Sequence, residues 1–191
     1  MQAQETLRKY FGHEAFRPGQ EVMVNALTHH RDALGVMPTG AGKSMCYQVP
    51  ALMMPGVAIV ISPLISLMAD QVAALKSAGV PAAYLNSSLT PRQMELAMQR
   101  ARQGAYKIIY VAPERLETPS FQAMAQSMPI SLLAVDEAHC VSQWGQDFRP
   151  SYLRIKAFVD NLPKRPVVGA FTATATAHVR EDIRTHLELH T

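Results

Sequence analysis

The sequence predicts a doubly wound α/β fold, in which one mostly parallel sheet is flanked by helices on both faces. Short apolar runs rich in β-branched residues alternate along the chain with longer segments of helical spacing. The runs are continuously apolar, which is typical of strands covered on both faces. The connections between them are long enough for parallel crossovers. We therefore expect ligands to bind beyond the carboxyl ends of the strands.

The individual elements follow from this alternation. The predicted strands lie at residues 33–37, 57–61, 82–85, 108–112, 130–135 and 167–171. The predicted helices lie at residues 20–27, 43–53, 65–77, 91–103, 152–161 and 177–187. Proline and glycine gather between these segments at turn positions, and no stretch has the composition of a domain linker.

Length and composition are those of one folded domain. The chain has 191 residues, of which 48% are hydrophobic, so it can bury a full core, but a second complete domain does not fit. The 18 Lys and Arg residues exceed the 15 Asp and Glu residues only slightly, giving a formal net charge of +3. This mild excess does not by itself predict a nucleic-acid partner.

Neither a metal-binding cysteine pattern nor a membrane segment is visible in the sequence. The two cysteines, Cys46 and Cys140, lie far apart and form no CxxC pair, so neither a disulfide framework nor a zinc site is indicated. The longest apolar stretch, residues 49–61, is interrupted by proline and glycine and is shorter than the roughly 18 residues of a spanning helix. The N-terminus lacks the order of a secretory signal. We therefore expect a cytoplasmic protein with no membrane partner.

A glycine-rich loop follows the first predicted strand and precedes a predicted helix. Its residues are Met37, Pro38, Thr39, Gly40, Ala41, Gly42, Lys43 and Ser44. Gly40 and Gly42 allow a tight turn whose N–H groups point at phosphate oxygens, and the helix N-terminus favours negative charge. Lys43 would reach the β- and γ-phosphates, and Ser44 would bind Mg²⁺. Met37 stands where the GxxxxGK pattern has its first glycine, and the alternative is an ordinary glycine turn with a solvated lysine.

Two adjacent carboxylates, Asp136 and Glu137, directly follow the predicted strand at residues 130–135. Burying both without a cation would be costly. A bound metal ion would offset this cost. Asp136 can hold Mg²⁺ through the ion's shell of water molecules, while Glu137 orients and deprotonates the attacking water. The alternative is a solvated acidic turn.

These two motifs together resemble the first RecA-like domain of superfamily 2 helicases, and further segments resemble RecQ-family DNA helicases in particular. The matching segments are the pattern from Leu7 through Phe11, Gly12, Phe16 and Arg17 to Gln20, and residues 63–71, 112–116, 136–150 and 172–176. The resemblance covers nearly the whole chain. It implies a RecA-like P-loop fold, binding of ATP and Mg²⁺, and movement along single-stranded DNA in the 3′ to 5′ direction.

The resemblance assigns the first of these segments to adenine recognition through His13, Phe16, Arg17 and Gln20. The amide of Gln20 can pair with adenine N6 and N7 together, which predicts ATP over GTP. Arg17 can stack on the base or meet a phosphate. The role of His13 in stacking is open, and a lone Gln or Arg is more often an ordinary surface residue.

The resemblance also assigns an aromatic loop that couples nucleotide to DNA. Its residues include Gln143, Trp144, Phe148 and Arg149, with His139 between this loop and Glu137. Aromatic rings stack on unpaired bases, and arginine adds charge. Further DNA-contacting or coupling residues would follow other strands: Ser62, Pro63, Pro113, Arg115, Thr172 and Thr174. The structural alternatives are an aromatic cluster that pins the loop to the core, ordinary turns, and threonines that cap a strand end.

From the resemblance, residues 1–191 are expected to be the helicase ATP-binding domain, which acts in DNA repair and recombination. The second RecA-like domain and the accessory domains would lie outside them. The expected partners are single-stranded or partly duplex DNA and that second domain, which in this family carries an arginine finger. The domain alone should bind nucleotide weakly and unwind nothing. A nucleotide-dependent DNA clamp and an RNA helicase remain alternatives. In a bacterium the protein would associate with the nucleoid.

Overall fold

The central feature of the computed structural model is a parallel sheet, and the structure describes residues 2–38, 42–173 and 175–190. The sheet order is β1-β6-β5-β2-β4-β3, and every neighbouring pair is parallel. Its strands are β1 (Ala33–Val36), β2 (Val57–Ile61), β3 (Ala82–Leu85), β4 (Ile108–Val111), β5 (Ile130–Val135) and β6 (Val167–Thr172). The predicted fold class is therefore confirmed.

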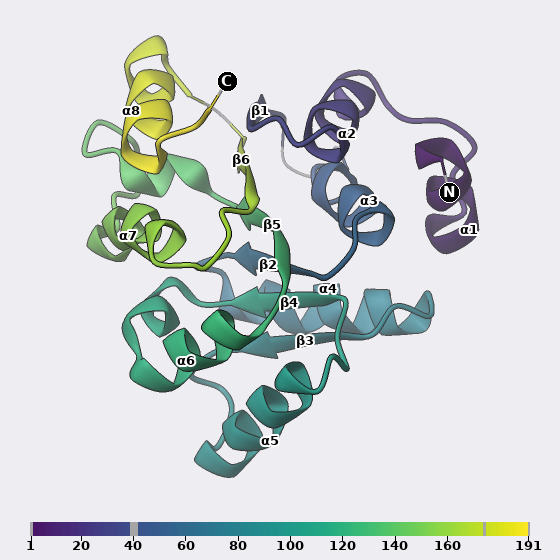
Figure 1. The fold of residues 1–191 in the computed structure, drawn as a ribbon. Helices are drawn as coiled ribbons and strands as arrows, with labels where there is room; N and C mark the ends of the chain where they lie inside the picture. The colour runs from purple at the N-terminus through teal and green to yellow at the C-terminus, as the bar shows by residue number, and fades with distance from the viewer. Residues whose placement is uncertain (1, 39–41, 174, 191) are drawn as a thin grey trace.

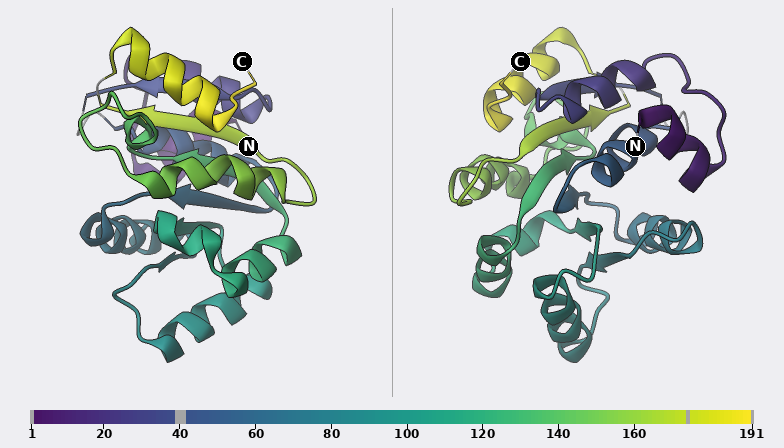
Figure 2. Two further views of the ribbon diagram at one scale, coloured as in Figure 1. Left: turned by 90° about the vertical axis from the view of Figure 1, so that its left-hand side faces the viewer. Right: turned by 45° about the vertical axis from the view of Figure 1, so that its right-hand side comes forward.

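Helices cover both faces of this sheet, so the described chain has three layers (Figure 1). One face carries α1 (Ala3–Phe11), α2 (Gln20–Thr28), α3 (Met45–Met53) and α4 (Ile65–Ser77). The other carries α5 (Pro91–Arg102), α6 (Pro119–Ser127), α7 (Ile155–Asp160) and α8 (Ala177–Leu187). The right-hand view of Figure 2 shows the two helical layers on either side of the twisted strands. None of the described helices is long and apolar enough to span a membrane.

Two hydrophobic cores form because successive strand side chains point to opposite faces. In β2, Val57, Ile59 and Ile61 pack into the core beneath α5 to α8. The intervening Ala58 and Val60 pack into the core beneath α2 to α4. All five residues of β2 are buried, which explains why the strand appears in the sequence as a continuous apolar run.

The predicted strands match the observed ones to within one residue, and the differences among the helices have local causes. Helix α3 begins at Met45, two residues later than predicted, because residues 42–44 still belong to the loop. The segment predicted at 152–161 is divided into a 3₁₀ helix, η3 (Pro150–Arg154), and the short α7. Helices α1 and α6 were not predicted. Phe121, Met124 and Ala125 of α6 do have helical spacing, so a signal for it was present.

The carboxyl ends of the strands lie at one edge of the sheet, and backbone hydrogen bonds continue the pairing beyond them. Met37 N donates to Thr172 O at 2.9 Å, which joins the start of the glycine-rich loop to the end of β6. Asp136 N donates to Ile61 O at 2.9 Å, which joins the acidic turn to β2. The residues predicted to act in chemistry are thereby collected along this edge.

Candidate nucleotide-binding site

Lys43 lies between the two adjacent carboxylates. Its Nζ is 2.9 Å from Asp136 Oδ1 and 3.7 Å from Glu137 Oε1. The three side chains are only 12%, 17% and 18% exposed, so they interact with little solvent screening. Because β6 separates β1 from β5, the loop after β1 must cross the end of β6 to make these contacts. The structure thus unites the two predicted motifs in one charged cluster.

The acidic turn is held in a conformation that is uncommon for glutamate. Glu137 has φ 50°, in the left-handed region that non-glycine residues rarely adopt. Its N–H donates to Asp136 Oδ1 at 2.9 Å, and the Tyr152 hydroxyl donates to Asp136 O at 2.8 Å. These bonds orient the Asp136 carboxylate and hold the backbone of the turn. Tyr152 was not singled out in the sequence, where it is one apolar residue of a predicted helix.

His139 connects this turn to the end of β6. It belongs to a 3₁₀ helix, η2 (Ala138–Val141), that follows Glu137 directly. Its Nε2 is 3.6 Å from Glu137 Oε2, and its Nδ1 is 2.7 Å from Thr172 Oγ1. The imidazole therefore spans from the predicted water base to a buried hydroxyl on β6. This contact gives the predicted coupling role of His139 a physical path.

The described part of the glycine-rich loop leads directly into the N-terminus of α3. Ser44 stands at the N-cap of α3 and makes no side-chain capping bond, while Lys43 precedes it. One hydroxyl, one carboxylate from Asp136 and phosphate oxygens form the oxygen-rich donor set that suits Mg²⁺. Among the described residues, no group of three or more His, Cys, Asp or Glu could hold a metal ion. Thr39, Gly40 and Ala41 lie outside the described residues, as does Thr174.

Gln20 packs against this loop. It is 3% exposed, its Nε2 donates to Gly42 O at 2.9 Å, and its Oε1 accepts from Arg17 N at 2.7 Å. Gly42 has φ 77°, and a Cβ there would lie 2.3 Å from Gln20 Nε2, so only glycine fits. The predicted adenine-reading amide thus bonds to backbone through both of its polar atoms, to the loop at Gly42 and to its own segment at Arg17.

The other predicted nucleotide residues differ in exposure. His13, Arg17 and Pro38 are exposed. Phe16 packs against the small core formed by Leu7, Val24 and Val49. Met37 is buried, with its sulfur 3.5 Å from Cys46 Sγ, so it fills space beneath the loop where the common pattern has glycine.

The aromatic loop, residues 143–149, follows η2 and projects from the same edge. Trp144 is 74% exposed, and its ring meets His178 of α8 edge-on with centroids 5.0 Å apart. Gln143 is also exposed, whereas Phe148 and Arg149 are partly buried. The Arg149 guanidinium pairs with Asp147, and the backbone N–H of Arg149 donates to Cys140 O at 2.9 Å. A hollow of about 560 Å³ lies between this loop and Glu137, and Trp144 and His139 are among its lining residues.

The remaining predicted DNA residues are more deeply embedded. Ser62 is 5% exposed and its hydroxyl accepts from Leu64 N at 3.2 Å, while Pro113 is buried and Pro63 is half-buried. Arg115 is half-buried, and its Nε has no hydrogen-bond partner among the described residues. It lines a hollow of about 720 Å³, to which Asn86 also contributes. The sequence analysis did not select Asn86, although it directly follows the β3 run.

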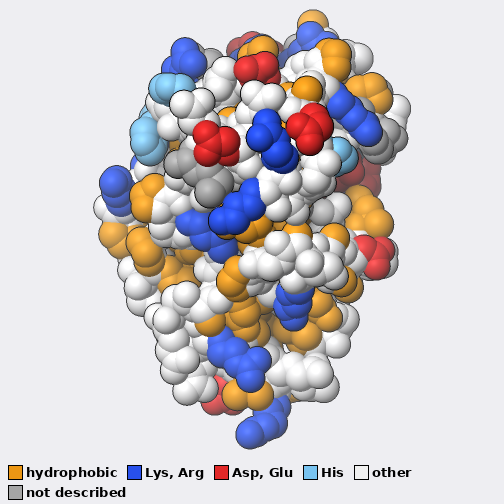
Figure 3. All heavy atoms as spheres, turned by 90° about the vertical axis from the view of Figure 1, so that its right-hand side faces the viewer, with side chains coloured by type: hydrophobic (Ala, Val, Ile, Leu, Met, Phe, Trp, Pro, Cys, Tyr) orange, Lys and Arg blue, Asp and Glu red, His pale blue; other side chains and the backbone are white. Residues whose placement is uncertain are grey.

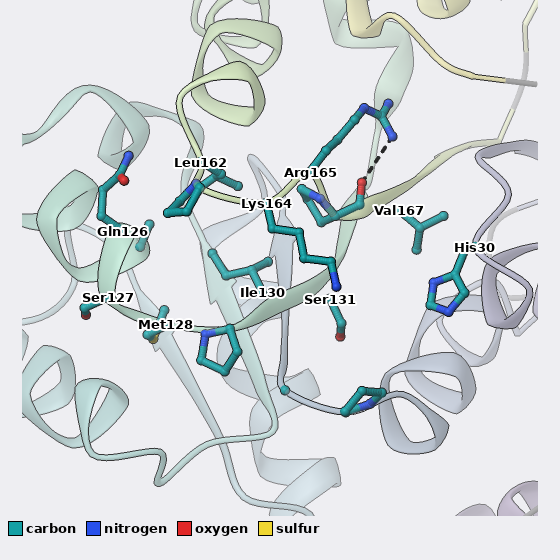
Figure 4. A pocket seen from close by; sticks show the side chains of 16 residues that line it. His30, Gln126, Ser127, Met128, Ile130, Ser131, Leu162, Lys164, Arg165 and Val167 are labelled. Carbon is teal, nitrogen blue, oxygen red and sulfur yellow. Dashed lines mark hydrogen bonds between the residues drawn. The ribbon is translucent and has the colours of Figure 1, made fainter.

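Charge forms no single broad patch on the face of the molecule shown in Figure 3. On the face shown in Figure 3, Lys and Arg side chains are dispersed among hydrophobic and uncharged groups. Another hollow, of about 480 Å³, lies at the opposite edge of the sheet, around the amino ends of β5 and β6. Figure 4 shows His30, Ile130 and Lys164 among its lining side chains. None of the residues of the Lys43 cluster lines it, so the predicted chemistry is confined to the carboxyl edge.

Comparisons with known proteins agree with this geometry. Residues 17–183 match the sequence model of DEAD/DEAH box helicases. The chain is 49% identical over 188 residues to the ATP-dependent DNA helicase RecQ of Bacillus subtilis, covering 98% of this chain and 32% of that protein. It is 46% identical over 187 residues to the protein of the same name from Haemophilus influenzae, covering 98% and 30%. The chain therefore spans about a third of the length of these relatives.

Solved structures support the fold at lower sequence identity. A hypothetical ATP-dependent RNA helicase from Sulfolobus tokodaii superposes with a TM-score of 0.73 at 19% identity, covering 97% of this chain and 54% of that one. The DUF1998 helicase MrfA bound to DNA superposes with a TM-score of 0.76 at 18% identity, covering 98% and 28%. These likenesses show that the three-layer architecture is shared.

Proposed function

Because this chain belongs to the DEAD/DEAH box helicase family, we propose that it is the ATP-hydrolysing half of a RecQ-type DNA helicase. The observation that carries the proposal is the position of Lys43, 2.9 Å from Asp136 and 3.7 Å from Glu137. A lysine of the phosphate loop and two carboxylates at a neighbouring strand end are the parts that phosphoryl transfer to water requires.

The roles of these residues follow from their chemistry. The Lys43 ammonium binds the β- and γ-phosphate oxygens and reduces the charge repulsion met by an incoming nucleophile. Ser44 and Asp136 would hold Mg²⁺, which when bound neutralises phosphate charge. Glu137 accepts a proton from the attacking water and orients it. Its fixed backbone and the nearby His139 ring, 3.6 Å away, hold the carboxylate in one direction.

DNA binding would take place on the aromatic loop and the adjoining edge of the sheet. The exposed ring of Trp144 can stack on an unpaired base, which contributes roughly 1–3 kcal/mol. His139 and Thr172 then provide a contact route from that loop to Glu137. Arg115, which lines the hollow of about 720 Å³, carries the positive charge that would suit a phosphate of the same strand. Movement would be 3′ to 5′, in DNA repair and recombination.

A second RecA-like domain would complete the site. The chain spans about a third of its relatives' length, and the Lys43 cluster lies at an open edge of the sheet. An arginine finger from that domain would stabilise charge in the transition state, and its loss can cost roughly 10³–10⁵ in rate. We expect the 191-residue chain alone to bind nucleotide weakly and to lack unwinding activity. If the protein is bacterial, a DNA substrate would place it in the cytoplasm, on the nucleoid.

The proposal is tested by Mg²⁺-dependent ATP hydrolysis in the full-length protein with and without single-stranded DNA. Glu137→Gln should keep ATP binding and lower the stimulated rate by about 10²-fold or more, because the amide cannot take the proton. Glu181→Gln, which changes a 73%-exposed carboxylate on α8, is the matched control and should behave like the wild type. An unchanged stimulated rate in Glu137→Gln would show that the assignment is wrong.

The same assay separates the alternatives. A nucleotide-dependent clamp would bind ATP and DNA without turnover, and it would have no use for a base at Glu137. Replacing the DNA strand by RNA of the same sequence distinguishes an RNA helicase. We expect stronger stimulation by DNA.

A further inference from the structure

The aromatic loop is attached to α8 by a hydrogen bond that no predicted motif contains. Ser142 is fully buried, and its hydroxyl donates to Asp182 Oδ2 at 2.6 Å. The Ser142 hydroxyl oxygen also accepts a hydrogen bond from Trp144 N at 3.2 Å. One buried hydroxyl therefore joins the backbone of the exposed tryptophan to a carboxylate of α8. A bond of this length to an ionised group is stronger than one between neutral partners.

A second contact between the loop and α8 lies one helical turn away. His178 and Asp182 are spaced i and i+4, so both project from one face of the helix. His178 packs against the ring of Trp144, while Asp182 holds the turn beneath that ring through Ser142. The side chain and the backbone of Trp144 are thus each oriented by α8.

The turn that carries Trp144 is also packed against His139. Gly145 N donates to Ser142 O at 3.1 Å, and a Cβ on Gly145 would lie 2.8 Å from His139 O. Ser142 N in turn donates to His139 O at 3.0 Å. Displacement of the tryptophan turn therefore acts directly on the backbone of the residue that faces Glu137.

Helix α8 provides a second connection between the aromatic loop and β6. It begins immediately after the segment that follows β6, and Thr176 caps it by accepting from Val179 N at 3.2 Å. Thr172, the last residue of β6, contacts the His139 ring. The loop and β6 are therefore linked twice, once through His139 and once through Asp182 and Ser142.

We infer that Asp182 is a positioning residue that, with Ser142, holds Trp144 ready for DNA and couples its displacement to His139. The inference rests on the proposed DNA-dependent ATP hydrolysis. Asp182 bonds to Ser142 and lies 4.0 Å from Nε2 of His178, the residue that packs against the Trp144 ring, so it acts on Trp144 through these neighbours. Replacing it should weaken coupling to DNA without weakening ATP binding.

The first test uses Trp144 as the probe, because it is the only tryptophan in the 191-residue chain. Time-resolved fluorescence anisotropy reports its nanosecond motion. Asp182→Ala and Ser142→Ala should each increase the fast-motion amplitude, and the double variant should add little beyond either single change. Asp182→Asn retains a side-chain oxygen that can accept from the Ser142 hydroxyl, so the fast motion of Trp144 should stay close to that of the wild type. Glu181→Ala, on the exposed side of α8, is the matched control and should leave Trp144 as in the wild type.

The second test measures ATP hydrolysis by the full-length protein over a range of oligo(dT) concentrations. Asp182→Ala should raise the oligo(dT) concentration for half-maximal stimulation by about tenfold, while the DNA-free rate and the KM for ATP change by less than about twofold. Asp182→Asn should recover most of the difference. General damage to the fold would instead alter the KM for ATP and would not be rescued by asparagine.

The outcomes separate this inference from the proposed function. Absence of DNA stimulation in the wild-type protein would overturn both. Normal wild-type stimulation, with unchanged anisotropy and unchanged DNA response in Asp182→Ala and Ser142→Ala, would overturn the inference alone. If Asp182→Ala unfolds in thermal melts, the folded Ser142→Ala and Asp182→Asn proteins decide. Equal behaviour of those two would overturn the inference, because only the asparagine variant keeps the bond.

Discussion

Lys43 and Asp136 form a close ion pair, with Nζ and Oδ1 2.9 Å apart at the carboxyl edge of the sheet. The pair joins the loop after β1 to the turn after β5, across the end of β6. Without a phosphate ligand, the lysine is the cation that balances the two adjacent carboxylates. Nucleotide binding must therefore redistribute these contacts, since Lys43 is also the group that phosphate attracts.

A double-mutant cycle tests this balance. Lys43→Met should lower nucleotide affinity at least tenfold and destabilise the ligand-free chain by about 1 kcal/mol, because the carboxylates lose their cation. Asp136→Asn combined with Lys43→Met should recover part of that stability. The free energy of unfolding from urea titrations of the four proteins measures the coupling. Strictly additive values would contradict an energetic link between the two residues.

The bond between His139 and Thr172 makes a second prediction. Thr172→Val keeps the shape of this fully buried side chain but removes the oxygen that lies 2.7 Å from His139 Nδ1. DNA stimulation of ATP hydrolysis should fall several-fold, while the KM for ATP changes by less than about twofold. Thr172→Ser retains the hydroxyl and should restore stimulation. Full stimulation in the valine variant would exclude this contact from the coupling route.

Stability is predicted to depend strongly on Asp32, which precedes β1. Its side chain is 1% exposed and accepts from both terminal nitrogens of Arg165, at 2.7 and 3.2 Å, and from Val168 N and His190 N. Asp32→Ala leaves these donors unpaired and should cost about 3–5 kcal/mol. The control is Asp160→Ala, which removes an exposed partner 3.8 Å from Lys156 and should cost less than about 1 kcal/mol. Denaturant titrations measure the free energy of unfolding of both variants, and equal losses of stability would refute the prediction.

The two thiols should be unreactive while the chain is folded. Burial raises the pKa of Cys46 and of Cys140 from 9.0 to about 12, so neither forms thiolate at pH 8. Ellman's reagent should detect almost no thiol in the native chain and two in denaturant. Rapid labelling of either native cysteine would show that it is accessible.

The same pKa shifts predict a loss of stability in alkali. Unfolded thiols ionise above pH 9.0 while folded ones remain protonated, so this contribution is complete below pH 9.0 and declines up to about pH 12. Within that window each thiol lowers the free energy of unfolding by about 1.4 kcal/mol per pH unit. The double variant Cys46→Ala and Cys140→Ala should flatten this slope, as measured by urea titrations at several pH values.

The sequence by itself determined the fold class and the chemistry expected at the nucleotide site. Doubly covered strands must be apolar on both faces, so β2 and β5 are visible as continuous runs. The glycine-rich loop and the acidic turn are local motifs of adjacent residues, so their spacing along the chain is enough to predict them as a nucleotide site. Helix α1 was not predicted, although Ala3, Leu7 and Phe11 have helical spacing and pack into one small core, so a signal for it was present.

Only the tertiary structure decided which distant residues meet. The order β1-β6-β5 places Lys43 against Asp136 and His139 against Thr172, and no local pattern specifies that order. The attachment of the aromatic loop likewise depends on how α8 packs, since Ser142 and Asp182 are 40 residues apart. Each residue alone resembles an ordinary polar residue of a turn or a helix. Their partnership arises because burial of the apolar face of α8 brings the carboxylate to a hydroxyl that has lost access to water.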